Sequence, residues 1–135
     1  MKKTIRENLI NDLNTAEWKK TLFSDKYLKY EDLYESEEKV RQALILPYGG
    51  FDNSDDIDVY FKKLMVSSID EIIEWLFNSK KRVIRFELEF ESNIGYVISK
   101  QDGEKTGSNK LVLALRRNKD CITKYGFFLS AFNVI

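Results

Sequence analysis

Four aspartates lie within seven residues near the middle of the chain, in the stretch PYGGFDNSDDID at positions 47–58. Carboxylates this close together can hold a metal ion, begin a helix or face a positively charged partner. A calcium loop needs oxygen ligands at alternate positions, a glycine at the sixth position and a glutamate at the twelfth. Counted from Asp52, the sixth residue is Ile57 and the twelfth is Lys63, so this is not a calcium loop. The Gly-Gly pair before the aspartates also lacks the Gly-Lys-Ser/Thr of a phosphate loop.

The aspartate cluster suits a helix start, because side-chain oxygens there accept hydrogen bonds from the free amides of the first turn. One or two acids are enough for that role, so the surplus predicts an acidic surface that faces a basic partner. Residues 31–74 carry twelve acidic and four basic side chains, a net charge of −8, which supports this interpretation. The residues predicted to contact the partner are Asp52, Asp55, Asp56 and Asp58, with a second patch of Tyr30, Tyr34, Glu35, Glu37 and Glu38.

Basic and aromatic side chains in the C-terminal half allow a second chemistry, the cleavage of phosphodiester bonds. The chain has no histidine, which removes the commonest general acid and base. A ribonuclease without histidine would use arginine to stabilise the phosphorane and tyrosine or lysine to move protons. The spacing does not require this, since lysine and arginine also protect strand edges, and we assign no catalytic residue. The residues to test for this alternative are Arg116, Arg117, Tyr125 and Ser130.

The overall composition predicts one folded domain over residues 1–135. At 43% hydrophobic and 33% charged, the chain has enough apolar residues for a core of its own. One cysteine and no histidine argue against disulfides and the usual zinc or iron sites, so we expect neither a metal nor a cofactor. The N-terminus lacks the apolar stretch of a signal peptide, and no apolar run is long enough to cross a membrane. We therefore expect a complete small cytoplasmic protein.

The spacing of apolar residues predicts that residues 1–79 are mainly helical. A stretch at 26–35 with three tyrosines is left open between irregular helix and loop. The predicted helices are one that buries Ile5, Leu9, Ile10 and Leu13, a short one at 16–23, one from Ser36 that buries Val40, Ala43 and Leu44 and stops at Pro47, one at 55–66, and one at 69–77.

From Lys80 onward apolar residues alternate with polar ones, which predicts strands. Residues 80–135 are expected to form an antiparallel meander of about four strands. Its parts are RVIRFELEFE, a tight turn at Ser92-Asn93, a strand at 94–100, the hairpin loop DGEKTGSN, a strand with Leu111, Leu113 and Leu115 inward, and a last strand in which either Phe127, Leu129 and Ala131 or Phe128, Ser130 and Phe132 face the core. The predicted fold class is α+β, with N-terminal helices packed on a C-terminal sheet.

Several segments from Gly50 onward resemble contact-dependent growth inhibition systems. In the RNase A-like toxin domains of those systems, a Phe-Asp segment precedes a helix that ends in Ile-x-x-Trp-Leu. A Gly-x-Val strand, a basic strand and a final Thr-Ala-Tyr/Phe-Pro strand follow. The similar segments of this chain are GGFDNSDDIDVYFKKL, IDEIIEWLFNSKKR, GYVISK, LVLALRR and GFFLSAFNVI.

The chain departs from these toxin domains at positions that matter for catalysis. The toxin domains carry a catalytic histidine upstream of this region, and this chain has no histidine. In the final motif, Ser130, Phe132 and Asn133 stand in place of threonine, the aromatic residue and proline. A toxin domain is also usually the C-terminal part of a much longer secreted protein. The resemblance therefore implies the other component, a non-catalytic CdiI-like immunity protein that binds its cognate toxin, a basic nuclease, and covers the active site.

Our first hypothesis is this immunity protein, whose partner is the toxin domain and which contacts neither nucleic acid nor a membrane. The alternatives are a histidine-free ribonuclease toxin of the RNase A-like type and a non-catalytic adaptor domain.

Overall fold

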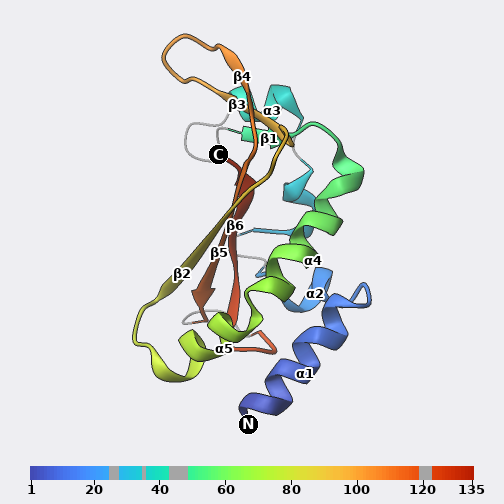
Figure 1. Cartoon of the computed structure of the whole chain (residues 1–135), viewed down its shortest axis with the longest axis vertical. Coiled ribbons are helices and arrows are strands. Elements are labelled where there is room, and N and C mark those ends of the chain that lie inside the picture. The colour runs from blue at the N-terminus through green and yellow to red at the C-terminus, as the bar shows by residue number, and fades with distance from the viewer. Residues whose placement is uncertain (25–27, 35, 43–48, 119–122) are drawn as a thin grey trace.

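The computed structural model describes residues 1–24, 28–34, 36–42, 49–118 and 123–135 (Figure 1), and its fold is α+β, as predicted. The helices are α1 (Lys2–Leu13), α2 (Trp18–Thr21), the 3-10 helix η1 (Tyr30–Leu33), α3 (Glu37–Gln42), the 3-10 helix η2 (Ser54–Asp56), α4 (Ile57–Ser67) and α5 (Ile69–Asn78). The strands are β1 (Gly49–Phe51), β2 (Val83–Glu89), β3 (Gly95–Ile98), β4 (Lys105–Ser108), β5 (Lys110–Arg117) and β6 (Phe127–Val134).

The predicted helices form where apolar residues recur at helical spacing, so that each helix buries one face. In the helix α3, Val40 is buried as predicted, whereas Ala43, Leu44 and Pro47 lie outside the described residues. Helix α2 is shorter than predicted, and the open question at 26–35 resolves, for residues 30–33, to the 3-10 helix η1. The buried residues of α4 and α5 are Ile57, Phe61, Leu64, Met65, Ile69, Ile72, Ile73 and Trp75.

The strands form two antiparallel sheets of three strands each, with the orders β1-β3-β4 and β2-β5-β6. The prediction of a single four-stranded meander is therefore wrong. The prediction fails because the chain does not reverse direction at Ser92-Asn93, so β2 and β3 do not pair with each other. A polar pair of this kind fits a bend as well as a tight turn.

One long bent hairpin connects the two sheets (Figure 1). One arm of the hairpin contains β2 and then β3, and the other contains β4 and then β5. Near the base β2 pairs with β5, from Val83↔Arg116 to Glu89↔Lys110, and toward the tip β3 pairs with β4. The corner lies at Asn109, whose side-chain amide donates to the carbonyl of Phe90 at 2.7 Å. The predicted hairpin loop is thus partly correct: the loop is shorter, and its second half is the strand β4.

Strand β1 was not predicted, and its two glycines explain how it fits. A Cβ on Gly49 would come within 2.7 Å of the carbonyl oxygen of Tyr96, and it would also meet the carbonyl of Val134. A Cβ on Gly50 would lie 2.6 Å from the hydroxyl oxygen of Tyr96. The Gly-Gly pair therefore allows β1 to approach β3 and the end of β6 closely.

The last strand, β6, buries residues from both of the alternating sets that the sequence left open. Its pairing with β5 shifts between Ala114↔Ala131 and Leu115↔Leu129, which leaves Ser130 as an extra residue. Such a bulge reverses which face the following side chains occupy. Phe127 and Leu129 therefore join the main core before the bulge and Phe132 joins it afterwards, while Phe128 is buried outside that core cluster.

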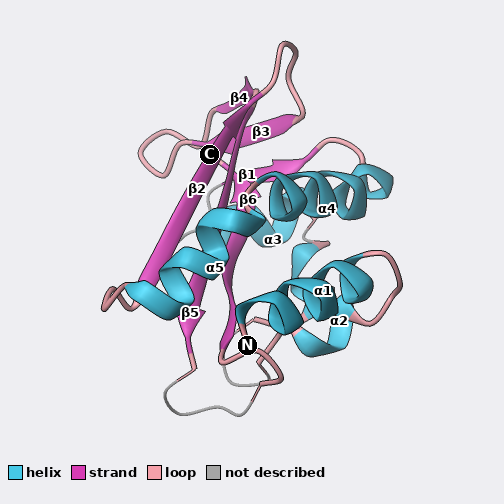
Figure 2. Ribbon diagram, turned by 60° about the horizontal axis from the view of Figure 1, so that its bottom comes forward, coloured by secondary structure: helices cyan, strands magenta, loops and turns pink. Residues whose placement is uncertain are grey.

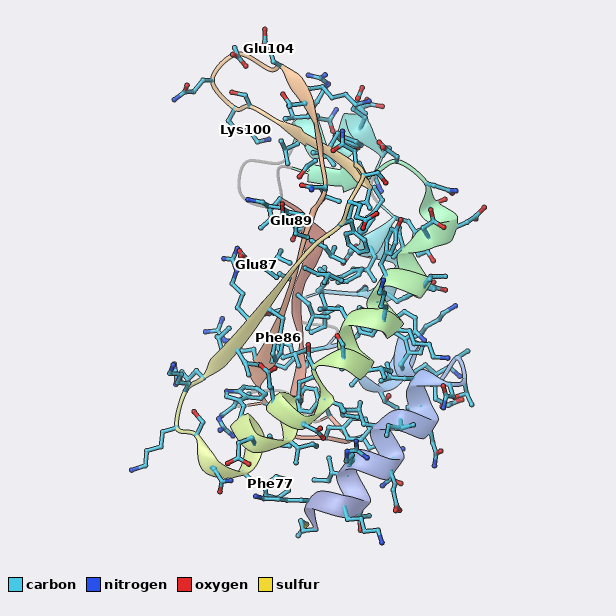
Figure 3. All side chains as sticks on the ribbon, viewed as in Figure 1. Phe77, Phe86, Glu87, Glu89, Lys100 and Glu104 are labelled. Atoms are coloured by element: carbon cyan, nitrogen blue, oxygen red, sulfur yellow. The ribbon has the colours of Figure 1, made fainter. Side chains whose placement is uncertain are left out.

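The helices α1, α4 and α5 lie along one face of the β2-β5-β6 sheet, as Figure 2 shows. On the edge strand β2, Glu87 and Glu89 point away from these helices, while Phe86 packs against the core (Figure 3). The alternation predicted for this strand is confirmed. Across the described part of the chain, no helix has both the length and the apolar character needed to span a membrane.

Candidate partner-binding surface

Three of the four clustered aspartates, Asp52, Asp55 and Asp56, lie between β1 and the first turn of α4, and we call them the aspartate turn. The side chain that caps this turn is Asn53, whose oxygen accepts from the backbone N–H of Asp55 at 3.0 Å. Asn53, rather than one of the aspartates, therefore provides the side-chain cap at this turn. Asp52 and Asp55 are exposed, and within the described residues none of the three aspartates forms an ion pair.

The aspartate turn concentrates negative charge at one place. Burial, together with the charges of Asp56 and Asp52, raises the pKa of the Tyr60 hydroxyl above its ordinary value. Both carboxylates are therefore within electrostatic reach of the same side chain. Neither carboxylate has an ion-pair partner among the described residues. Their negative charge therefore acts on any molecule that approaches from solvent.

The fourth aspartate, Asp58, is instead tied to the molecule's own side chains. Its Oδ1 accepts hydrogen bonds from the hydroxyls of Tyr30 at 2.8 Å and Tyr34 at 3.0 Å, and its Oδ2 lies 3.2 Å from Nζ of Lys19. Burial, the neighbouring Tyr30 hydroxyl and the Asp58 carboxylate raise the pKa of Tyr34. The structure thus brings three predicted site residues together, but in a network that joins α4 to η1 and α2.

Two glutamates of the second predicted patch, Glu37 and Glu38, lie on α3. Glu37 forms an ion pair with Lys105 at 2.7 Å and another with Arg41 at 3.7 Å, and the hydrogen bond from Lys105 lowers the pKa of Glu37. Glu38 is exposed and accepts from the amide of Gln42 at 3.4 Å. Glu35 lies outside the described residues. The acidic surface predicted from sequence is therefore divided: Asp58 and Glu37 are paired with lysines, whereas the aspartate turn and Glu38 form no ion pair with any described residue.

Arg117, a candidate for phosphate chemistry in the alternative hypothesis, acts as a clamp on the end of α5. Its guanidinium donates to the carbonyls of Trp75 at 2.7 Å, Leu76 at 3.1 Å and Lys81 at 2.9 Å, and it also donates to that of Ser79. The guanidinium also lies over the ring of Trp75 at 4.9 Å. These contacts satisfy carbonyls that the helix end leaves free.

Tyr125, the second candidate of that alternative, is buried and donates its hydroxyl proton to the carboxylate of Asp12. Asp12 is itself buried and also accepts from Lys124 at 3.2 Å and Thr21 at 3.1 Å. Burial and the hydrogen bond to Asp12 raise the pKa of Tyr125, so its hydroxyl stays protonated. The sequence analysis did not predict that Asp12 is buried. Its position three residues after Leu9, beside the apolar stripe of α1, was the signal that could have indicated this.

The remaining candidates are divided between the interior and the surface. Ser130 donates to the carbonyl of Ala114 at 3.2 Å, as part of the β6 bulge. Phe132 is buried and stacks on Phe51 with a centroid distance of 5.6 Å. Arg116 is exposed on β5.

The acidic side chains do not assemble into a metal site in the part of the chain that the structure describes, where no group of three or more His, Cys, Asp or Glu residues has a suitable arrangement.

No protein-family model matches the sequence, and no curated protein matches it. Among solved structures, a chain in the crystal structure of a CdiA-CT/CdiI complex from Y. kristensenii 33638 is similar, with a TM-score of 0.61 and 12% sequence identity. The similarity covers 82% of this chain and 96% of that chain. At this identity the likeness concerns the fold alone. The protein therefore has a fold that is also found in a toxin–immunity complex of contact-dependent growth inhibition, in one of its two components.

Proposed function

We propose that this protein is the immunity protein of a contact-dependent growth inhibition system, and that it neutralises a nuclease toxin by binding over its active site. The observation that carries the proposal is the shared fold with a chain of a CdiA-CT/CdiI complex. In this proposal the protein acts in the cytoplasm, its partner is a protein, and it has no catalytic residue.

The choice of the immunity component is supported by what the candidate catalytic residues do. The guanidinium of Arg117 and the hydroxyl of Tyr125 are both committed to hydrogen bonds inside the molecule. A catalytic group must be able to reach the substrate phosphate within hydrogen-bond distance, and a buried tyrosine with a raised pKa is a poor proton donor or acceptor at neutral pH. Immunity needs binding alone, and a ribonuclease would need these groups to be released.

The binding mechanism rests on the aspartate turn. A nuclease toxin that holds RNA has a basic active site, and exposed carboxylates with no ion-pair partner attract it over a long range and orient it on approach. Asp52, Asp55 and Asp56 are the first contacts in this mechanism. Of the remaining predicted contacts, Asp58 and Glu37 are already paired with lysines, so they contribute less to this attraction.

The direct test is binding to the toxin domain encoded beside this protein's gene, measured over a series of salt concentrations. The charge reversal Asp55→Lys/Asp56→Lys is expected to lower the association rate constant about tenfold or more at low salt, and the difference should shrink as salt screens the charges. The matched control is Glu71→Lys/Glu91→Lys, which makes the same change of charge at two exposed positions elsewhere.

Two outcomes would contradict the proposal at different levels. If the wild-type protein does not bind the toxin domain, the immunity function is wrong. If both double variants slow association equally, the protein binds through another surface. Growth of the producing cells addresses the alternative function, because a ribonuclease toxin expressed alone should arrest growth, whereas an immunity protein should be harmless and should protect cells that also make the toxin.

A further inference from the structure

On α2 and the start of η1, three lysines and two aromatic rings surround an open pocket of about 520 Å³. We call it the lysine pocket, and none of its lining residues belongs to the aspartate turn. Pockets of this size hold small organic ligands. Its lining residues are Lys19, Lys20, Phe23, Lys29, Tyr30 and Glu31.

The frame of the lysine pocket is anchored in the core. Trp18, next to the first lysine, is buried and stacks on Phe61 with a centroid distance of 4.4 Å. The carbonyl of Leu22 accepts from the backbone N–H of Leu129 in β6 at 2.8 Å. A β-bridge pairs Ser24 with Leu28, and the residues on either side of this pair, Phe23 and Lys29, both line the pocket. These contacts tie the backbone beside the lysines to α4 and β6.

The positive charge of the lysine pocket is only partly compensated. Lys19 is paired with Asp58 at 3.2 Å and lies over the ring of Tyr30 at 4.7 Å. Lys20 and Lys29 are exposed, and their ammonium groups form no ion pair with any residue that the structure describes. Glu31 is the one acid among the lining residues. The pocket thus offers two free ammonium groups beside a half-buried phenylalanine.

We infer that the lysine pocket binds the phosphate group of a nucleotide. A terminal phosphate carries close to two negative charges near neutral pH, which matches the two free lysines, and lysine binds phosphate as a point charge. The pocket is larger than a phosphate alone and has room for the attached nucleoside, whose base can pack against Phe23 as bases do on aromatic side chains. The same phosphate chemistry is offered by a free mononucleotide and by the end of a single-stranded RNA.

The experiment is a titration of the full-length protein, followed through its backbone amide NMR signals. Adenosine 5′-monophosphate is expected to shift the amides of Lys20, Phe23 and Lys29 in a saturable way, whereas adenosine, which lacks the phosphate, should not. Lys20→Gln/Lys29→Gln is expected to weaken the affinity about tenfold, because two charge-assisted hydrogen bonds are lost. The control Lys39→Gln/Lys62→Gln removes the same charge from two other exposed lysines and should leave the affinity unchanged.

A short single-stranded RNA with a 5′-phosphate distinguishes the two sources. Binding of the RNA more tightly than the mononucleotide, with shifts at the same amides, identifies RNA as the ligand, and equal affinity identifies the free nucleotide. The inference is overturned if no saturable shift occurs up to about 10 mM nucleotide. It is also overturned if the control weakens binding as much as the pocket variant, or if a glutamate-rich peptide binds as tightly. The inference goes beyond the proposed function and does not depend on it, since toxin binding is absent from the experiment.

Discussion

At the scale of single residues, Asp12 shows how one buried charge can join distant parts of the chain. Its carboxylate accepts hydrogen bonds from Thr21, nine residues away, and from Lys124 and Tyr125, more than a hundred residues away. Burial alone would raise the pKa of Asp12, but the hydrogen bonds from Tyr125 and Lys124 outweigh it and hold the pKa below its ordinary value. A carboxylate in this state stabilises the fold as long as it is charged.

The variant Asp12→Asn is expected to lower the free energy of unfolding by about 2 kcal/mol at pH 7, because the half-exposed Lys124 and the buried Tyr125 lose their charged acceptor. Since the folded pKa lies below the unfolded value of 3.8, this stabilisation is present above that value and disappears as the pH falls through the folded pKa. Urea unfolding at several pH values measures both effects. The stabilities of wild type and variant should begin to converge only below pH 3.8 and should meet once the pH lies below the folded pKa of Asp12. Glu71→Gln, at an exposed position, should change neither quantity.

At the scale of secondary-structure elements, the positions of β1 and of the end of α5 each depend on a few particular residues. The pair Gly49 and Gly50 lets β1 lie against β3 and β6, where any side chain would collide with backbone or with the ring of Tyr96. The guanidinium of Arg117 donates to free carbonyls in the last turn of α5 and just after it. Both contacts join elements that are far apart in sequence.

Gly49→Ala is expected to destabilise the protein by about 3 kcal/mol, because its Cβ would meet backbone atoms that cannot move independently. The comparison is Gly126→Ala, which has a positive φ of 79° and no atom within 4 Å of the added Cβ. That variant should cost about 1 kcal/mol through backbone conformation alone. Thermal unfolding of both variants measures the difference, and equal costs would show that β1 does not pack as closely as described.

Arg117→Lys is expected to cost about 2 kcal/mol, because an ammonium group cannot donate to all the carbonyls that the planar guanidinium reaches. Arg116→Lys on the exposed face of the same strand is the control and should be neutral. Guanidinium chloride unfolding compares the two variants. A neutral result for Arg117→Lys would mean that the end of α5 is held mainly by Trp75 and the apolar contacts of the helix.

The sequence was a good guide to elements whose buried face is a local pattern, and a poor one to contacts between distant residues. The stripe of α5 and the alternation of β2 each predict their element, because the periodicity follows from burial of one face. The bend at Ser92-Asn93 could not be distinguished from a tight turn, since the choice depends on pairing with β4 and β5. Likewise, nothing near Asp58 in sequence indicates that two tyrosines from η1 and its C-cap donate to it.

At the scale of the whole molecule, the two sheets differ in how firmly they are embedded. In the β2-β5-β6 sheet the central strand β5 has a partner on both sides and buries Leu111, Leu113 and Leu115 completely. In the β1-β3-β4 sheet the edge strand β4 is largely exposed. Local opening is cheaper where few apolar contacts must be broken.

Hydrogen exchange should therefore divide the molecule into two parts. The amides of Leu113 and Leu115 are expected to exchange only through global unfolding, and those of Thr106 and Val97 through local opening of the β3–β4 hairpin, at least about a hundredfold faster. Exchange measured in low concentrations of denaturant tests this, because only the first pair should depend strongly on denaturant. A common, strong dependence would mean that both sheets open as one unit.

The strand β6 also has a consequence for how the protein is made. It pairs with β5, approaches β1 through Val134, and binds the carbonyl of Leu22 near the N-terminal end. Of the described elements it is the last to be synthesised. The α2 segment, β1 and β5 therefore leave the ribosome without the strand that joins them, and the assembled core can form only after Phe127–Val134 has emerged. A chain that stops before β6 therefore lacks the strand that joins the α2 segment, β1 and β5.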